Sequence, residues 1–258
     1  MSALLAVSIG NTRVGLGVFA GPAVEGPPLP DVTVSVPLPQ GGAFSPEFEA
    51  GTAVDAAVVA SVNPPATAPV LDWIAASFDV DPLLFPRDLP PGLANRCDPP
   101  DAVGADRLAN AVAAYDEFRT TCIVVDAGTA ITVDVVSADG PAFLGGAILP
   151  GPALAARALS QGTALLPELA LTDTAAAVGA STAAAVSSGV LRGLAGAADR
   201  LISDIRDEVG ICEHTVVTGG DADWLMRYCE AMLAARPHLT LSGLAAAYRA
   251  HGPGSSAR

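Results

Sequence analysis

Apolar residues occur along this chain in short runs that are broken by turn-forming residues. One run covers residues 3–19 and is broken at residues 10–12, Gly-Asn-Thr; another covers residues 121–137 and is broken at residues 126–129, Asp-Ala-Gly-Thr. Apolar runs of strand length on both sides of a turn predict two strand–turn–strand hairpins. Each turn offers a hydroxyl and a Gly, and Gly lets main-chain N–H groups approach a ligand closely.

The second hairpin also carries a carboxylate. Asp126 stands at the end of its first strand, and Gly128 and the hydroxyl of Thr129 follow. A carboxylate that holds a cation beside close main-chain N–H groups suits a metal-bound phosphate. Two such turns, each opening one half of the chain, predict two similar domains on either side of a nucleotide.

The rest of the pattern predicts further strands and helices. Strands are predicted over residues 32–37, 55–62, 142–151 and 213–220, and helices over residues 69–78, 103–118, 153–159, 181–209, 223–235 and 241–250, with a short helical alternative at 46–50. The order β-β-β-α-β-α in the first half is typical of a ribonuclease-H-like domain. We therefore expect an α/β fold of two ribonuclease-H-like (actin-like ATPase) domains, residues 1–118 and 119–258, facing each other across a nucleotide cleft.

Two loops carry candidate chemistry. Asp106 and Arg107 lie in the first turn of a predicted helix, after Gly104. They are either a dipole-compensating carboxylate and a solvated cation, or a base and an anion clamp placed after a Gly hinge. The pair Gly219-Gly220 follows a predicted strand and indicates either a nucleotide contact or an ordinary tight turn.

The predicted helix 181–209 has an N-cap at Ser181 or Thr182. Its predicted inward-facing residues are Val186, Val190, Leu194, Leu201 and Ile205. Small residues at 189, 193 and 196 indicate the close approach of another helix. That helix belongs either to a second copy of the chain, as in a homodimer, or to the same chain.

Composition excludes several classes of partner. The chain has 258 residues and a formal net charge of −14, which disfavours nucleic acid because phosphate backbones would be repelled. The four cysteines show no CxxC spacing and indicate reduced thiols, and no apolar run is long enough to span a membrane. No signal peptide precedes the first strand, so we expect a cytoplasmic protein without a membrane partner.

Three segments together resemble the type III pantothenate kinases of the acetate and sugar kinase, heat-shock cognate and actin superfamily. Ser8-Ile-Gly-Asn-Thr12 is similar to the family's first phosphate motif, Gly104-Ala-Asp-Arg107 to its pantothenate and catalytic motif, and Asp126-Ala-Gly-Thr-Ala130 to its second phosphate motif. The similarity covers nearly the whole chain. A sugar or acetate kinase is disfavoured, because Gly-Ala-Asp-Arg belongs to the pantothenate branch.

The resemblance implies ATP-dependent phosphorylation of pantothenate to 4'-phosphopantothenate, the first step of coenzyme A biosynthesis, by a homodimer. It implies that Asp106 is the general base. The substrate would be held by Gly104, Ala105, Asp106, Arg107 and Thr182. The ATP phosphates would be met by Ser8, Gly10, Asn11, Thr12, Arg13 and Thr129, with Mg²⁺, and Asp126 would bind a monovalent cation, K⁺ or NH₄⁺.

Four positions depart from the family pattern. Where this chain has Ser8, the family has Asp. Where it has Cys97, Gly162 and Ser242, the family usually has Tyr, Arg and Glu, respectively. A hydroxyl at residue 8 cannot supply the charge of a carboxylate. The departures leave a second hypothesis open, a catalytically impaired homologue with a binding or regulatory role.

Overall fold

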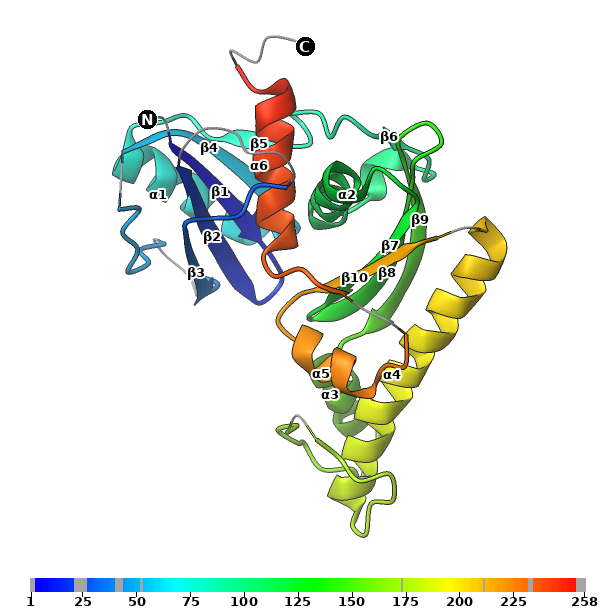
Figure 1. The fold of residues 1–258 in the computed structure, drawn as a ribbon. Helices are drawn as coiled ribbons and strands as arrows, with labels where there is room; N and C mark the ends of the chain where they lie inside the picture. Colours follow the sequence, from blue (N-terminus) through cyan, green and yellow to red (C-terminus); the bar gives the residue numbers. More distant parts are fainter. Residues whose placement is uncertain are drawn as a thin grey trace. The chain divides into compact units, whose positions relative to one another are not determined.

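The computed structural model describes residues 3–20, 27–39, 44–51, 53–172, 174–210, 212–231 and 234–253. Parts of the predicted loop 21–30, of the polar stretch 40–52 and of the tail 252–258 therefore lie outside the described residues. The chain forms two compact units (Figure 1). The first comprises residues 1–119, 136–144 and 238–258, and the second residues 120–135 and 145–237.

The sheet of the first unit has the strand order β3-β2-β1-β4-β5. Its strands are β1 (Ala3–Ile9), β2 (Arg13–Ala20), β3 (Val32–Pro37), β4 (Val54–Ser61) and β5 (Leu83–Phe85). The strands β1, β2 and β3 pair antiparallel, whereas β4 runs parallel to β1 and to β5. The predicted first hairpin and the predicted strands over 32–37 and 55–62 are confirmed.

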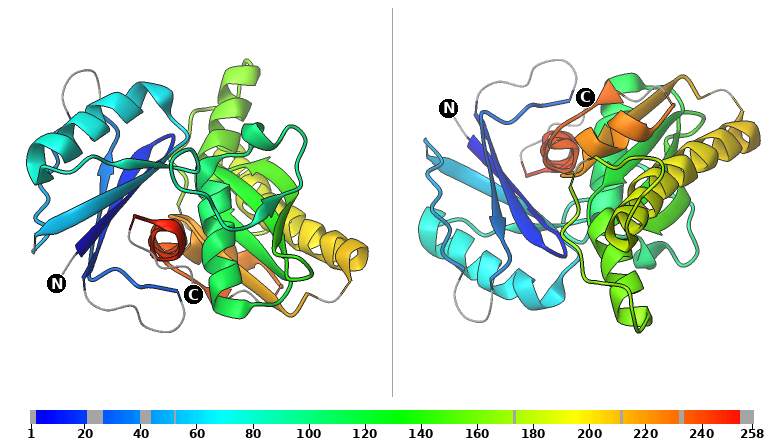
Figure 2. Two further views of the ribbon diagram at one scale, coloured as in Figure 1. Left: turned by 90° about the horizontal axis from the view of Figure 1, so that it is seen from above. Right: turned by 90° about the horizontal axis from the view of Figure 1, so that it is seen from below.

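Helix α1 (Pro64–Phe78) covers one face of this sheet (Figure 2). It begins five residues before the predicted start, at residue 69, because prolines at the first helical positions lack N–H groups that would need acceptors. The Asn63 side chain caps it by accepting a hydrogen bond from the Ala66 N–H at 3.3 Å. Val70 and Ile74 are fully buried, as the helical spacing predicted.

The predicted short helix at 46–50 is wrong. Residues 44–50 contain no helix, and Phe44 and Phe48 pack edge-on against Trp73 of α1, at 5.3 and 6.2 Å between ring centroids. These aromatic contacts bury the segment without intrahelical hydrogen bonds, and so short a helix is marginal in water. Within the described residues, β4 follows β3 directly, so the order is β-β-β-β-α-β.

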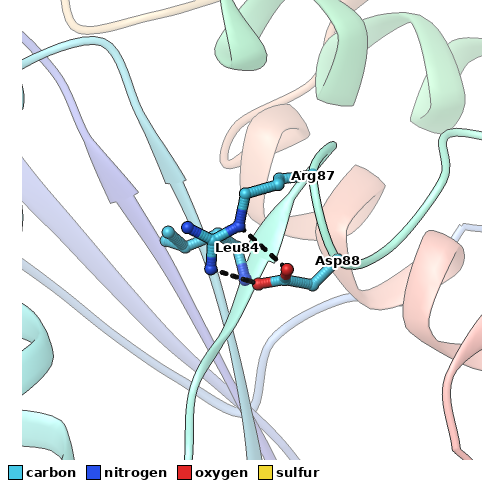
Figure 3. Close-up of polar contacts among 3 residues, drawn as sticks. All are labelled: Leu84, Arg87 and Asp88. Carbon is cyan, nitrogen blue, oxygen red and sulfur yellow. Dashed lines mark hydrogen bonds and ion pairs between the residues drawn. The ribbon is translucent and has the colours of Figure 1, made fainter.

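A tight turn ends β5. The Asp88 carboxylate accepts hydrogen bonds from the Leu84 N–H at 2.9 Å and from the Arg87 guanidinium at 2.8 and 2.9 Å (Figure 3). The Arg87 hydrogen bonds are the main reason why the pKa of Asp88 falls to about 2. The connection predicted over residues 85–101 also contains the short strand β6 (Ala94–Asn95) and a 3₁₀ turn at Pro100–Ala102.

Two further helices belong to the first unit, α2 (Ala105–Phe118) and α6 (Leu239–His251). Both confirm predicted helices. Helix α6 packs on the face of the sheet opposite α1, and it lies between β1 and β2 on one side and α2 on the other (Figures 1 and 2). Its close approach is possible because Gly17 of β2, which pairs with Ala6 of β1, presents no side chain to it.

The second sheet has the strand order β11-β10-β7-β8-β9-β6. Its strands are β7 (Cys122–Ala127), β8 (Ala130–Ser137), β9 (Ala142–Pro150), β10 (His214–Thr218) and β11 (Ala234–Ala235), besides β6. The strands β7 and β8 form the second predicted hairpin. Gly140, with φ +72°, lies in the turn before β9, which confirms the predicted turn at residues 139–140.

The helices of the second unit are α3 (Pro152–Gly162), α4 (Thr182–Val209) and α5 (Ala222–Tyr228). The hydroxyl of Ser181 caps α4 by accepting a hydrogen bond from the Ala184 N–H at 3.2 Å, which decides between the two predicted caps. The residues of α4 that enter the core with the sheet and α5 are Leu191, Ala195, Ala198 and Ile202. Of the predicted inward-facing residues, Val190 is buried, and Leu194, Leu201 and Ile205 are partly buried against this core, so the predicted stripe is mostly confirmed and lies beside the fully buried one.

The predicted helix over 223–235 is too long. Asp199 of α4 accepts hydrogen bonds from the N–H groups of Glu230 and Ala231, both at 2.8 Å, and from the Cys229 thiol. These bonds hold the chain in a non-helical path after Tyr228. Further along the chain, residues Ala234–Ala235 form strand β11, which pairs with β10.

Candidate functional site

The first candidate segment is the turn between β1 and β2. The Gly10 N–H donates to the Arg13 carbonyl at 2.9 Å, which closes the turn, and Asn11 and Thr12 at its tip are exposed. Ser8 is half-buried on β1. Arg13 is engaged by the neighbouring strand, because its Nε donates to the Ser35 hydroxyl at 2.7 Å.

The first unit brings this turn close to the start of α2. The Val62 N–H at the end of β4 donates to the Ile9 carbonyl at 3.0 Å, and a Cβ at Gly104 would lie 3.4 Å from Val62 Cγ1. The same Cβ would lie 2.6 Å from Asp106 Oδ1, so the Asp106 carboxylate occupies the space that Gly104 leaves free. Residues 8–13 and 104–107 are thus neighbours through Val62.

Asp106 is a mostly buried carboxylate in the first turn of α2. Its Oδ1 accepts a hydrogen bond from the Arg107 N–H at 2.8 Å. Burial raises the pKa of Asp106 above its ordinary value, and the hydrogen bond and charge of Arg107 offset only part of that rise. A carboxylate with a raised pKa is a stronger proton acceptor, as a general base requires.

Arg107 is half-buried, and its guanidinium lies 5.3 Å from the centroid of the Phe143 ring. This side chain is therefore not fully solvated. A guanidinium placed on a ring keeps a fixed direction and can hold a carboxylate.

The second candidate segment is the turn between β7 and β8, in the second unit. The Gly128 N–H donates to the Ala130 carbonyl at 3.0 Å, and the Gly151 N–H donates to the Thr129 carbonyl, also at 3.0 Å. A Cβ at Gly151 would lie 2.0 Å from the Gly128 carbonyl oxygen. The loop after β9 therefore touches this turn through backbone alone.

Gly219, which follows β10, contacts the β7–β8 turn at Asp126 and Ala127. It has φ +96°, and a Cβ there would lie 2.2 Å from the Ala127 carbonyl oxygen and 2.6 Å from Asp126 Oδ1. Gly219 therefore fits the tight-turn alternative. Gly220 differs, because a Cβ there would meet no atom within 4 Å, so open space adjoins it.

Thr182 is exposed at the first position of α4, where it lines a groove between α3 and α4. The groove has a volume of about 710 Å³ and is mostly apolar. Its other lining residues include Pro150, Leu159, Leu166, Val186, Val190 and Leu194. Among the described residues, no atom lies within 4 Å of a Cβ placed at Gly189, Gly193 or Gly196, so packing within that part of the chain does not explain these glycines.

The four positions that depart from the family pattern lie in different settings. Ser8 and Cys97 are half-buried, and Ser242 in α6 is 2% exposed. Gly162, at the end of α3, adjoins open space.

Several buried polar residues were missed in the sequence analysis. Asp134 of β8 is 1% exposed and accepts a hydrogen bond from the Thr132 hydroxyl at 2.9 Å. Asn110 of α2 is 1% exposed and accepts one from the Thr240 hydroxyl at 2.8 Å. Only the presence of polar residues inside apolar runs marks them in the sequence.

Within the described parts of the chain, no three His, Cys, Asp or Glu side chains gather closely enough to hold a metal ion. This fits a Mg²⁺ that is bound through one or two carboxylates and the phosphates of its nucleotide. None of the four cysteines forms a disulfide. Among the described helices, none combines the length and the apolar character needed to span a bilayer.

Comparison with known proteins decides the family. A model of the type III pantothenate kinase family matches residues 4–204. A type III pantothenate kinase of Dehalococcoides mccartyi strain CBDB1 is 35% identical over 254 residues, covering 95% of each chain. One of Anaeromyxobacter sp. strain K is 33% identical over 246 residues, covering 93% of this chain and 96% of its own. The chain belongs to the type III pantothenate kinase family.

Solved structures support the fold class. A Campylobacter jejuni protein described as a Baf family member is 22% identical and superposes with a TM-score of 0.57, covering 95% of this chain and 97% of its own. A ROK family glucokinase from Streptomyces griseus is 15% identical and superposes with a TM-score of 0.50, covering 95% of this chain and 98% of its own. The predicted α/β fold with two ribonuclease-H-like domains is confirmed at the level of the fold.

Proposed function

We propose that this type III pantothenate kinase homologue transfers the γ-phosphoryl group of ATP to the primary hydroxyl of pantothenate, the first step of coenzyme A biosynthesis. The observation that carries the proposal is the Asp106 carboxylate, which lies partly buried at the start of α2, with a raised pKa and close to the β1–β2 turn. Membership of the family supports the kinase hypothesis, and no observation favours a catalytically impaired homologue.

Asp106 acts as the general base. Its carboxylate accepts the proton of the pantothenate hydroxyl while the hydroxyl oxygen forms a bond to the γ-phosphorus. The bond between that phosphorus and the β,γ-bridging oxygen breaks, and ADP leaves with the electron pair. Arg107, with the backbone of Gly104 and Ala105, holds the pantothenate carboxylate, and Thr182 adds a hydroxyl contact.

The β1–β2 turn and the β7–β8 turn carry the residues proposed to bind the nucleotide and its cations. Residues 8–13 and Thr129 bind the ATP phosphates, because their backbone N–H groups and hydroxyls are donors at tight turns. Asp126 binds a monovalent cation, K⁺ or NH₄⁺. Mg²⁺ bound with ATP supplies neutralisation of the phosphate charge.

A direct assay tests the proposed reaction. Purified protein with ATP, Mg²⁺, K⁺ and pantothenate should form 4'-phosphopantothenate and ADP in equal amounts, detected by mass spectrometry. Replacement of K⁺ by NH₄⁺ should preserve the rate, whereas Na⁺ should lower it. Absence of phosphopantothenate under all three salts would contradict the kinase, and equal rates in all three would contradict only the cation site at Asp126.

A second copy of this chain is the partner that we propose for the groove between α3 and α4. The groove is mostly apolar, and Gly189 and Gly193 on its wall leave room for a helix to approach. Leu159, 39% exposed, and Leu165, 92% exposed, extend the apolar surface along α3 and the loop after it. A homodimer would bury these side chains.

We keep two further proposals from the sequence, domains of residues 1–118 and 119–258 and a location in the cytoplasm. The compact units place α6 with α2, so the first unit includes residues from beyond 119. Four free thiols fit a reducing compartment.

A further inference from the structure

Helix α6 is in backbone contact with α2. Gly243 is buried, and a Cβ at this position would lie 1.8 Å from the Ala109 carbonyl oxygen and 2.6 Å from its carbonyl carbon. Only glycine fits there without moving one of the two helices. The contact therefore sets the distance between the helix axes, but it does not by itself stop one helix from sliding along the other.

A partly buried hydrogen bond between the two helices opposes this sliding. The Thr240 hydroxyl donates to Asn110 Oδ1 at 2.8 Å, one turn before Gly243 on α6, and joins residues that are 130 positions apart in the sequence. Asn110 is 1% exposed, so the loss of this donor inside the protein is unfavourable. Asn110 also lies four residues after Asp106, on the same face of α2.

The same helix contacts the hairpin that leads to the β1–β2 turn. A Cβ at Gly17 of β2 would lie 3.0 Å from Leu241 Cδ1, so Leu241 packs directly on that strand. Helix α6 therefore touches β2 through Leu241 and α2 through Thr240 and Gly243. One rigid helix connects the two segments of the first unit that carry candidate site residues.

We propose that Thr240 is a positioning residue that acts through Asn110 to hold Asp106 in register with the β1–β2 turn. This inference rests on the proposed function, because it takes Asp106 to be the base. A base has to lie within hydrogen-bond reach of the hydroxyl, and a displacement of about 1 Å costs on the order of 100-fold in rate. Thr240 itself touches no reacting atom in this proposal.

The test compares three variants of the full chain. Thr240→Val keeps the shape of the side chain and removes the donor, Thr240→Ser keeps the donor, and Ala250→Ser adds a hydroxyl at an exposed position of the same helix. We expect Thr240→Val to lower kcat about tenfold or more, with KM for pantothenate and ATP within about twofold of the wild type. Thr240→Ser and Ala250→Ser should keep kcat within about threefold.

A second readout does not depend on activity. Carboxyl NMR of ¹³C-labelled protein follows the titration of Asp106, assigned with Asp106→Asn. Thr240→Val should move this titration toward that of an ordinary Asp, because a displaced α2 opens the carboxylate to water. Thr240→Ser should leave it at the wild-type position.

The outcomes separate this inference from the proposed function. A wild type without kinase activity would remove the proposed function, and the NMR titration would still decide whether Thr240 positions Asp106. A folded Thr240→Val protein with wild-type kcat and an unchanged titration would overturn the inference, as would a Thr240→Ser protein as impaired as Thr240→Val. Should Thr240→Val not fold by circular dichroism, Thr240→Ala is measured instead, with the same expectations.

Discussion

At the scale of single residues, the candidate site depends on the environment of one carboxylate. The sequence places Asp106 after Gly104 at the start of a helix, but it does not reveal burial. The structure adds that Gly104 makes room for the carboxylate and that burial raises its pKa. Helix α2 packs against α6 and β4, which lie far from it in the sequence, so no local pattern shows how deeply a residue of α2 is buried.

Asp106→Asn is expected to abolish phosphorylation, with kcat at least about 1000-fold lower, while the fold is kept. Asn has nearly the same volume, and its Oδ1 can accept the same hydrogen bond from the Arg107 N–H. Steady-state kinetics and binding of pantothenate by calorimetry check this. Near wild-type turnover in the variant would remove Asp106 from the role of base.

The raised pKa of Asp106 also makes a prediction about pH. A carboxyl whose pKa is higher in the folded than in the unfolded state adds stability at low pH, and this contribution is lost as pH rises through the folded pKa. Asp106→Asn should therefore gain in stability relative to the wild type as pH rises from acidic values to neutrality. Urea unfolding at several pH values measures this difference, and Arg107, the neighbouring charge, is kept in both proteins. A difference that does not vary with pH would mean that Asp106 has an ordinary pKa.

Ser8 is the residue at which the chemistry departs most from the family. Asp at this position would add a negative charge on β1 beside the β1–β2 turn, where it could hold Mg²⁺ or its water ligands. We expect Ser8→Asp to raise kcat or to lower the Mg²⁺ concentration needed for half-maximal rate, by about threefold or more. Ser8→Asn, which has similar size and no charge, is the control. A wild type that turns over well and is harmed by Ser8→Asp would show that other groups organise the phosphates.

At the scale of elements, the apolar periodicity was sufficient for most strands and helices. The hairpins, α2 and α6 were predicted because their apolar residues follow the period of the element. The end of α5 could not be predicted, because Asp199 on another helix takes up the N–H groups that would have continued it. On α4 the periodicity found residues that pack against the core, such as Leu194 and Leu201, but it did not show that Leu191 and Ile202 beside them are the most deeply buried.

The turn between β7 and β8 provides an element-scale prediction. Gly219→Ala should lower the free energy of unfolding by about 2–4 kcal/mol, because φ is positive and the new Cβ would overlap the Ala127 carbonyl. Gly220→Ala, next to it, has open space and should change stability by less than about 1 kcal/mol. Chemical denaturation of both variants measures the difference. Equal effects would mean that the backbone contact at Gly219 is not a constraint on the turn.

At the scale of the whole molecule, the chain enters the first unit, builds the second, and returns to the first with α6. The apolar pattern of the elements does not show which core a late helix such as α6 joins. The apolar groove of the second unit is a molecular-scale feature as well, since its walls come from α3, α4 and the loops beside them.

Gly193→Arg should dissociate the proposed homodimer, because it introduces a charged side chain into the apolar groove. Ser203→Arg adds the same charge at an exposed position of α4 outside the groove, and it should leave the oligomeric state unchanged. Sedimentation velocity of the wild type and both variants measures the mass. A monomeric wild type, or a Gly193→Arg protein that remains dimeric, would contradict the proposed partner.

The contact between α6 and α2 also determines when a newly made chain becomes competent. Asn110 is added to the growing chain 130 residues before Thr240. At elongation rates of about 5–20 residues per second, this interval lasts roughly 6–26 seconds. During this interval α2, which carries Asp106, is already synthesised, but α6, which packs against α2, is not. If Thr240 positions Asp106 as proposed, a nascent chain should gain activity only after α6 has emerged.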